Sequence, residues 1–106
     1  MTKFVLLYNG GGMPESEAEQ AAVLKAWEDW YTELGKAVVD PGNPFSPVAK
    51  SVKRDGTVID GPVGTMASGY SILEAGSLDA AVEMAKGCPM LAGNGDISIF
   101  EAFEIM

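Results

Sequence analysis

A carboxylate and a phenol are the strongest candidates for chemistry in this sequence. Asp60 begins the tripeptide Asp60-Gly61-Pro62, and Tyr70 lies in the apolar segment that follows it. A carboxylate held in a pocket beside a tyrosine hydroxyl can act as a general base, so this pair predicts proton transfer on a small molecule. The alternative is structural, because an aspartate before glycine commonly bonds to nearby backbone N–H groups and stabilises a turn.

Four other residues are predicted to bind a small ligand: Tyr8, Asn9, Trp27 and Ser68. A tyrosine combines an apolar ring with a hydroxyl, which suits a pocket and equally suits ordinary packing. Trp27 and Trp30 are three residues apart on a predicted helix and are therefore neighbours on its surface. They are interpreted either as core residues or as an aromatic clamp for an apolar substrate.

The sequence contains no histidine, which removes several classes of site. Histidine-based triads, histidine metal sites and axial histidine ligation of haem are excluded. Cys88 is the single cysteine, so no intrachain disulfide and no four-cysteine metal site can form. Cys88 follows a predicted helix C-terminus, whose negative partial charge opposes thiolate formation. No metal and no organic cofactor is therefore expected.

The charge balance is acidic, with 15 Asp and Glu residues against 7 Lys and Arg residues and a net charge of −8. Such a field repels phosphate backbones and anionic membrane surfaces, so neither nucleic acid nor a membrane is an expected partner. The N-terminal residues lack the long apolar stretch of a secretory signal. Together with the single cysteine, these features predict a cytoplasmic protein.

The elements that must position these residues follow from the apolar patterning. The segment 3–8 predicts a strand that is apolar on both faces. An amphipathic helix follows, begun either by Pro14 at its first position or by Ser16 as a cap with Glu19 three residues later. Gly35 is expected to end this helix. Residues 37–40 predict a second, short strand.

The second half of the chain is predicted to contain a hairpin followed by a strand, a helix and a strand. Asp55-Gly56 between two extended runs predicts an exposed hairpin, and residues 68–75 predict the next sheet strand. Ser77 is expected to cap a helix over 78–86, with Leu78, Val82 and Ala85 on one apolar stripe. Gly87 and Pro89 are expected to end it, and residues 97–105 predict the last strand.

The length of 106 residues suits a single domain, 1–106, with 47% apolar and 21% charged residues. The order of elements predicts an α+β fold: a ferredoxin-like split βαβ with an inserted β-hairpin and two helices on one face of an antiparallel sheet. Phe4, Leu6 and Tyr8 would lie on one face of the sheet and Val5 and Leu7 on the other, while the two helices can cover only one face. An exposed apolar sheet face is a large adhesive patch, so a homodimer is expected.

Four segments carry a resemblance to a known family: KFVLLYNG, Asp60-Gly61-Pro62, SGYSILEA, and SLDAAVEMAKGCPML leading into GDISIFEAFEI. In order and spacing they resemble the YCII-related, or DGPF, domain family, over essentially the whole chain. The resemblance implies a dimeric α/β barrel, in which two sheets lie face to face with the helices outside. It also implies a ligand cleft between the helices and the sheet of each protomer.

Activity is mostly unassigned in the DGPF branch, and the His–Asp pair of other YCII-like members cannot be carried over to a chain without histidine. The sequence also departs from the DGPF pattern, because Val63 follows the tripeptide where the family has Phe and then charged residues. Three hypotheses remain. The chain is a cofactor-independent enzyme acting on a small hydrophobic metabolite through Asp60 and Tyr70, a non-catalytic binding or accessory dimer, or a structural scaffold.

Overall fold

The computed structural model describes residues 1–105. The strands are β1 (Thr2–Gly10), β2 (Val38–Asp40), β3 (Lys50–Val52), β4 (Val58–Asp60), β5 (Ala67–Ala75) and β6 (Gly95–Ala102). The helices are α1 (Glu17–Leu34), α2 (Leu78–Ala85) and α3 (Pro89–Ala92), with a short 3₁₀ turn, η1 (Gly35–Ala37), after α1. None of the helices in residues 1–105 is long and apolar enough to cross a membrane.

Four strands form one antiparallel sheet in the order β2-β5-β1-β6, and β3 and β4 pair separately as a two-stranded hairpin. The predicted α+β class with an antiparallel sheet is therefore confirmed. The four-stranded sheet of this chain is open and does not close into a barrel.

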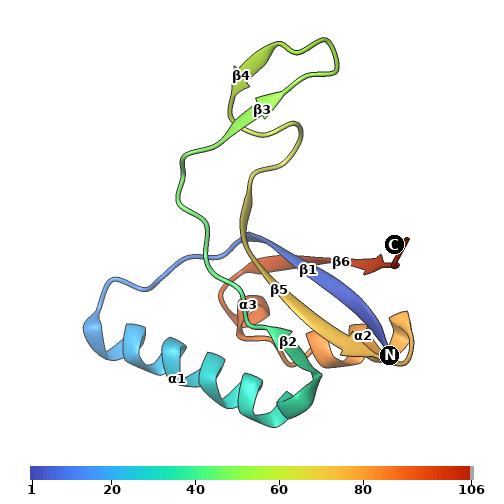
Figure 1. Ribbon diagram of the computed structural model, residues 1–106. Coiled ribbons are helices and arrows are strands. Elements are labelled where there is room, and N and C mark those ends of the chain that lie inside the picture. The colour runs from blue at the N-terminus through green and yellow to red at the C-terminus, as the bar shows by residue number, and fades with distance from the viewer. Residues whose placement is uncertain (106) are drawn as a thin grey trace.

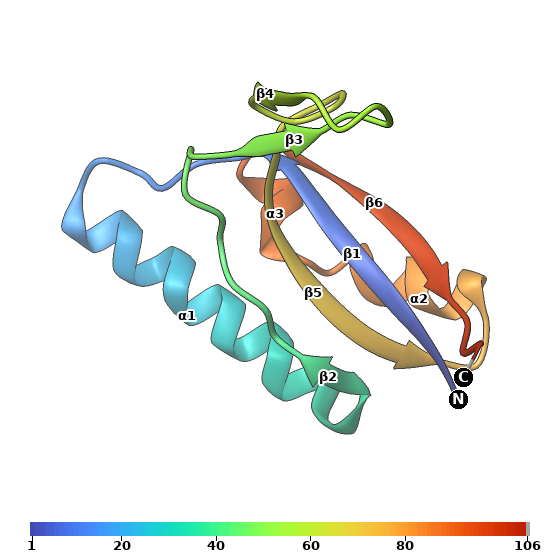
Figure 2. The ribbon, with the colours of Figure 1, turned by 45° about the horizontal axis from the view of Figure 1, so that its top comes forward.

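The helices lie together on one side of the four-stranded sheet (Figures 1 and 2). Strand residues alternate between the two faces, and burial follows this alternation. Phe4, Leu6 and Tyr8 on β1 are buried under the helices, while Val5 and Leu7 on the other face are only half-buried. We call this second face, which no helix covers, the open face.

The ends of α1 agree with the predicted signals. Ser16 is the N-cap, and its Oγ accepts a hydrogen bond from Glu19 N at 3.1 Å. Pro14 lies before the helix, so the alternative start at Pro14 is wrong. Gly35 ends the helix with φ 57°, a conformation that glycine adopts without steric cost.

Three predictions in the C-terminal half are wrong in detail. Leu78 is 45% exposed, because Ala81 and Ala85, not Leu78, pack into the core from α2. The last strand ends at Ala102, and Phe103 beyond it is exposed. Pro89 was expected only to end the preceding helix, but it begins α3, a single turn, at a position where proline's missing N–H costs nothing.

The predicted hairpin is confirmed, and it projects away from the four-stranded sheet on the side opposite the helices (Figure 1). Its turn is stabilised by Asp55, whose Oδ1 accepts a hydrogen bond from Thr57 N at 2.8 Å, and Gly56 takes φ 92°. We call residues 45–66, the hairpin with its flanking segments, the arm.

Gly42 lies two residues after the end of β2 and packs against Tyr70 of β5. An alanine at this position is expected to destabilise the fold. Its φ is 74°, and a Cβ would overlap the carbonyl oxygen of Tyr70. We expect Gly42→Ala to lower the free energy of unfolding by about 2–4 kcal/mol in urea denaturation. Gly12→Ala is the matched control, since a Cβ there meets open space. Equal stability of the two variants would contradict this packing.

Candidate functional site

A pocket of about 440 Å³ lies between α1, the loop after β1 and the ends of β1 and β5. Its size is within the range of small-molecule sites. The lining residues come from the sheet, the glycine loop, α1, the segment after β2, and α3: Tyr8, Gly10, Gly11, Gly12, Met13, Val23, Leu24, Trp27, Tyr31, Pro41, Gly42, Asn43, Pro44, Ser68, Gly69, Tyr70 and Met90.

Aromatic rings form one wall of this pocket. The rings of Tyr8 and Trp27 meet edge to face with centroids 5.4 Å apart, and Trp27 lies 5.8 Å from Tyr31 in a tilted arrangement. Helical spacing places Trp27 and Tyr31 one turn apart on α1. Trp30 packs behind them, 96% buried, and donates its indole N–H to Met84 O at 3.1 Å. Trp27 is thus a wall residue and Trp30 a core residue.

Three hydroxyl groups form a network at the buried end of the pocket. Tyr8 donates to Ser71 Oγ at 2.7 Å, and Ser71 in turn donates to Pro41 O at 2.8 Å. Tyr31 donates to the same carbonyl at 2.9 Å and lies 3.1 Å from Ser71 Oγ. Each hydroxyl proton therefore has a protein acceptor. Of the three residues, Tyr8 and Tyr31 line the pocket, so their oxygen lone pairs are the ones that a ligand can reach.

The two tyrosines of the network stay neutral. Burial raises the pKa of Tyr8 well above its ordinary value, and burial also raises the pKa of Tyr31. Neither phenol loses its proton at neutral pH, so neither is a base there.

None of the lining residues carries a charge. One lining residue has an unmet polar group: within the part of the chain that the structure describes, Ser68 Oγ is buried without a hydrogen-bond partner. A buried hydroxyl without a partner is costly. The pocket is thus neutral, largely apolar and aromatic, with few polar atoms.

The structure brings together Tyr8, Trp27, Ser68 and Tyr70 of the predicted site residues. Asp60 is not among them. It ends β4 on the arm, where its side chain is 89% exposed and its Oδ1 pairs with Lys50 Nζ at 2.6 Å. The expected convergence of Asp60 and Tyr70 on one pocket is therefore absent within residues 1–105.

Tyr70 contributes to the pocket edge, but its side chain has partners of its own. Strand alternation directs it to the face opposite Ser71. Its ring stacks on Phe45 with centroids 5.8 Å apart, and its hydroxyl donates to Asp40 Oδ2 at 3.1 Å. That bond to a carboxylate raises the pKa of Tyr70. The hydroxyl of Tyr70 therefore bonds to the last residue of β2.

Asn9 does not line the pocket. It lies on β1 next to Tyr8, at the position where the register with β5 shifts, and it pairs with Ala67 and Asp96. Alternation along β1 directs the side chain of Asn9 away from the face that carries Tyr8.

Two residues of the hydroxyl network were not among the predicted site residues. Tyr31 was not predicted to bind a ligand, although its spacing of four from Trp27 places both on one face of the helix. Ser71 lies at the centre of an apolar strand, fully buried between Gly69 and Leu73. A lone serine at an inward position of a strand is the signal that could have identified it.

Cys88 lies beside Tyr8 under the sheet and is 97% buried. Burial raises the pKa of its thiol from 9.0 to about 11. Below pH 9 the thiol is protonated in both the folded and the unfolded chain, so stability does not depend on this group. Between pH 9 and 11 only the unfolded chain ionises, so stability falls as pH rises.

We therefore expect the free energy of unfolding to drop by about 2 kcal/mol from Cys88 between pH 9 and 11. Urea denaturation over this pH range measures it. Cys88→Ala should show a shallower fall, because the contribution of the thiol is then absent. Parallel curves for the two proteins would contradict the burial of the thiol.

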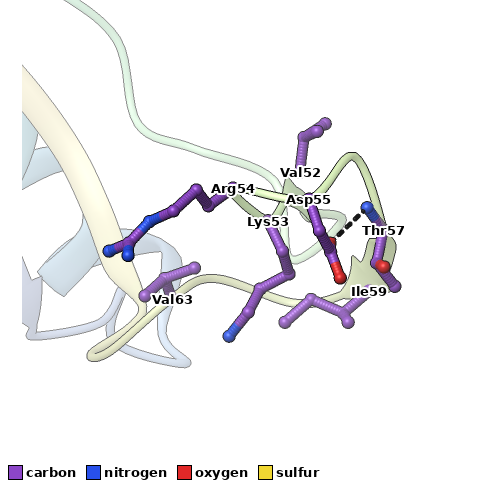
Figure 3. A pocket seen from close by; sticks show the side chains of 7 residues that line it. All are labelled: Val52, Lys53, Arg54, Asp55, Thr57, Ile59 and Val63. Atoms are coloured by element: carbon purple, nitrogen blue, oxygen red, sulfur yellow. Dashed lines mark hydrogen bonds between the residues drawn. The ribbon is translucent and has the colours of Figure 1, made fainter.

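A second hollow lies on the arm, lined by Val52, Lys53, Arg54, Asp55, Thr57, Ile59 and Val63 (Figure 3). It is shallow and combines apolar with basic side chains. Val52 and Val63 are about 70% exposed, at 72% and 70% respectively. Such a surface is suited to contact with another macromolecule rather than to enclosing a small molecule.

Comparison with models of known protein families found no match, and neither did comparison with curated protein sequences.

Proposed function

We propose that this protein binds a small, uncharged, largely apolar molecule with a ring system in the pocket between α1 and the sheet. The observation that carries the proposal is the lining of the pocket, which includes four aromatic residues and no charged one. An ionic ligand would lose its hydration there without gaining a counter-charge. A flat apolar ring would gain edge and face contacts with Trp27 and Tyr31.

The polar atoms of the pocket support one further property of this ligand. The protons of Tyr8, Tyr31 and Ser71 are used within the protein, so the network offers acceptors. Ser68 Oγ is buried and without a partner among the described residues. A ligand hydroxyl can donate to these oxygens and also accept from Ser68, so it fits better than a ligand that only accepts hydrogen bonds.

Binding is proposed in preference to turnover. Asp60, the predicted base, lies outside the pocket and pairs with Lys50. The tyrosines inside it stay protonated at neutral pH because burial raises their pKa values. The pocket thus lacks a group that could accept a proton, as the acid–base hypothesis requires.

Isothermal titration calorimetry with three naphthalene derivatives tests the proposal at pH 7. The probes are 2-naphthol, which is neutral and donates a hydrogen bond, 2-methoxynaphthalene, which is neutral and does not, and 2-naphthoate, which is charged. We expect 2-naphthol to bind about fivefold more tightly than the ether, the value of one hydrogen bond of about 1 kcal/mol. The carboxylate should bind at least tenfold more weakly than 2-naphthol.

Tight binding of 2-naphthoate would contradict the proposal, since nothing in the pocket could neutralise it. Equal binding of 2-naphthol and 2-methoxynaphthalene would contradict the proposal that the ligand donates a hydrogen bond, but not the proposal that the ligand is neutral and apolar. Conversion of a bound probe to a product would show that the protein is an enzyme and would contradict the proposal that it only binds its ligand.

For the fold, we propose a ferredoxin-like arrangement within the YCII-related family, as the sequence resemblance implies. The strand order β2-β5-β1-β6, with the βαβ units split across it, supports this. We also propose that two copies pair through their open faces as a dimeric barrel. Val5, Leu7, Ile72 and Phe100 place apolar side chains on that face, and Phe100 is 55% exposed. A cytoplasmic location stays a prediction from the sequence.

A further inference from the structure

We propose that the arm is a clasp: the arm of one copy packs against the acidic surface of a second copy, with helix α1 of that copy as its main contact. This inference rests on the proposed dimer and names a second interaction surface within it.

The arm has no core of its own. Its two strands pair over three residues each, and its apolar side chains are exposed, with Val48 81%, Val52 72% and Val58 57% accessible. An isolated two-stranded hairpin is marginally stable in water and needs a surface to pack on. Within residues 1–105 the arm packs on no helix (Figure 1).

The charge of the arm is opposite to that of the rest of the chain. Three of the seven basic residues lie on the arm, with only two of the fifteen acidic ones. Lys50 pairs with Asp60, whereas Lys53 and Arg54 form no ion pair among the described residues. In Figure 3 these two side chains extend from the hairpin beside Val63. The surface therefore fits an acidic, partly apolar partner.

Helix α1 has that composition. It carries five acidic residues and one basic residue, Lys25, which already pairs with Asp29 at 3.2 Å. It also exposes apolar surface, as Leu24 is 56% accessible. A second copy of this chain thus supplies the surface that the arm lacks.

The position of the arm is consistent with this partner. The arm leaves the sheet on the side of the open face, where a second copy is proposed to lie (Figure 1). Stacked sheets lie about 10 Å apart, and an extended strand of about ten residues spans about 33 Å. The arm is long enough to pass the edge of a partner's sheet and contact its α1.

Sedimentation equilibrium of the full chain tests the clasp. We expect Lys53→Glu combined with Arg54→Glu to raise the dissociation constant of the dimer at least tenfold at 50 mM salt. Lys36→Glu combined with Lys86→Glu is the matched control, because it makes the same change in net charge outside the arm. Raising the salt to 500 mM should weaken the wild-type dimer and narrow this difference.

Zero-length carbodiimide cross-linking of a mixture of ¹⁴N- and ¹⁵N-labelled chains then locates the contact. We expect mixed-isotope peptides that join Lys53 to a carboxylate of α1. A dimer that tolerates the arm substitutions as well as the control would overturn the clasp and leave the open-face dimer standing. A wild-type chain that stays monomeric would overturn both. Neither result bears on the pocket's preference for neutral probes.

Discussion

Replacing Trp30 by alanine is expected to lower the free energy of unfolding by about 3–5 kcal/mol, a large part of the total stability of a domain of this size. Trp30 is the one fully buried side chain on α1, with 4% exposure. Its ring packs against Trp27 and Tyr31, and its indole N–H bonds to Met84 O on α2. Alanine would leave a cavity and remove this hydrogen bond, although Met84 O would keep the backbone N–H of Gly87 as a partner.

Urea denaturation followed by circular dichroism measures this loss, since fluorescence would change with the tryptophan itself. Leu24→Ala is the matched control, because Leu24 lies on the same helix and is 56% exposed. We expect the control to change stability by less than about 1 kcal/mol. A loss below about 1 kcal/mol for Trp30→Ala would contradict the packing of α1 on α2.

Replacing Trp27 by alanine is expected to weaken 2-naphthol binding at least tenfold while the protein stays folded. Trp27 is only half-buried, and its ring stands between Tyr8 and Tyr31 on the wall of the pocket. Removing the ring takes away aromatic contact worth more than about 1.4 kcal/mol, which is a factor of ten. Calorimetric titration measures the change.

Phe103→Ala is the matched control for this experiment, since Phe103 is an aromatic residue that lies 78% exposed beyond β6 and outside the pocket. It should leave the affinity unchanged. If Trp27→Ala bound 2-naphthol as tightly as the wild type, the aromatic wall would have no part in binding.

The elements of this fold follow closely from local signals, and the exceptions have a common cause. Ser16, Gly35 and the Asp55-Gly56 turn work through bonds within a few residues, so the sequence is sufficient to place them. Leu78 was misplaced because the side of α2 that meets the sheet is decided by tertiary packing, in which small alanines allow close approach. Local periodicity cannot resolve that choice.

The candidate site was predictable only in part for a similar reason. Tyr8, Trp27 and Ser68 were identified from residue type and position, and they do line the pocket. Asp60 was chosen because its tripeptide is conspicuous, yet its place on the arm depends on how far the hairpin projects. Ser71 was passed over because its role exists only once Tyr8, Tyr31 and Pro41 meet around it.

Mapping the binding of 2-naphthol on the ¹⁵N-labelled protein by NMR tests the central claim most directly. The account predicts that amide shifts concentrate at Tyr8, Gly11, Leu24 and Gly69, which surround the pocket between α1 and the sheet. Shifts confined to the arm around Val52 and Ile59, or no saturable shifts at all, would contradict it.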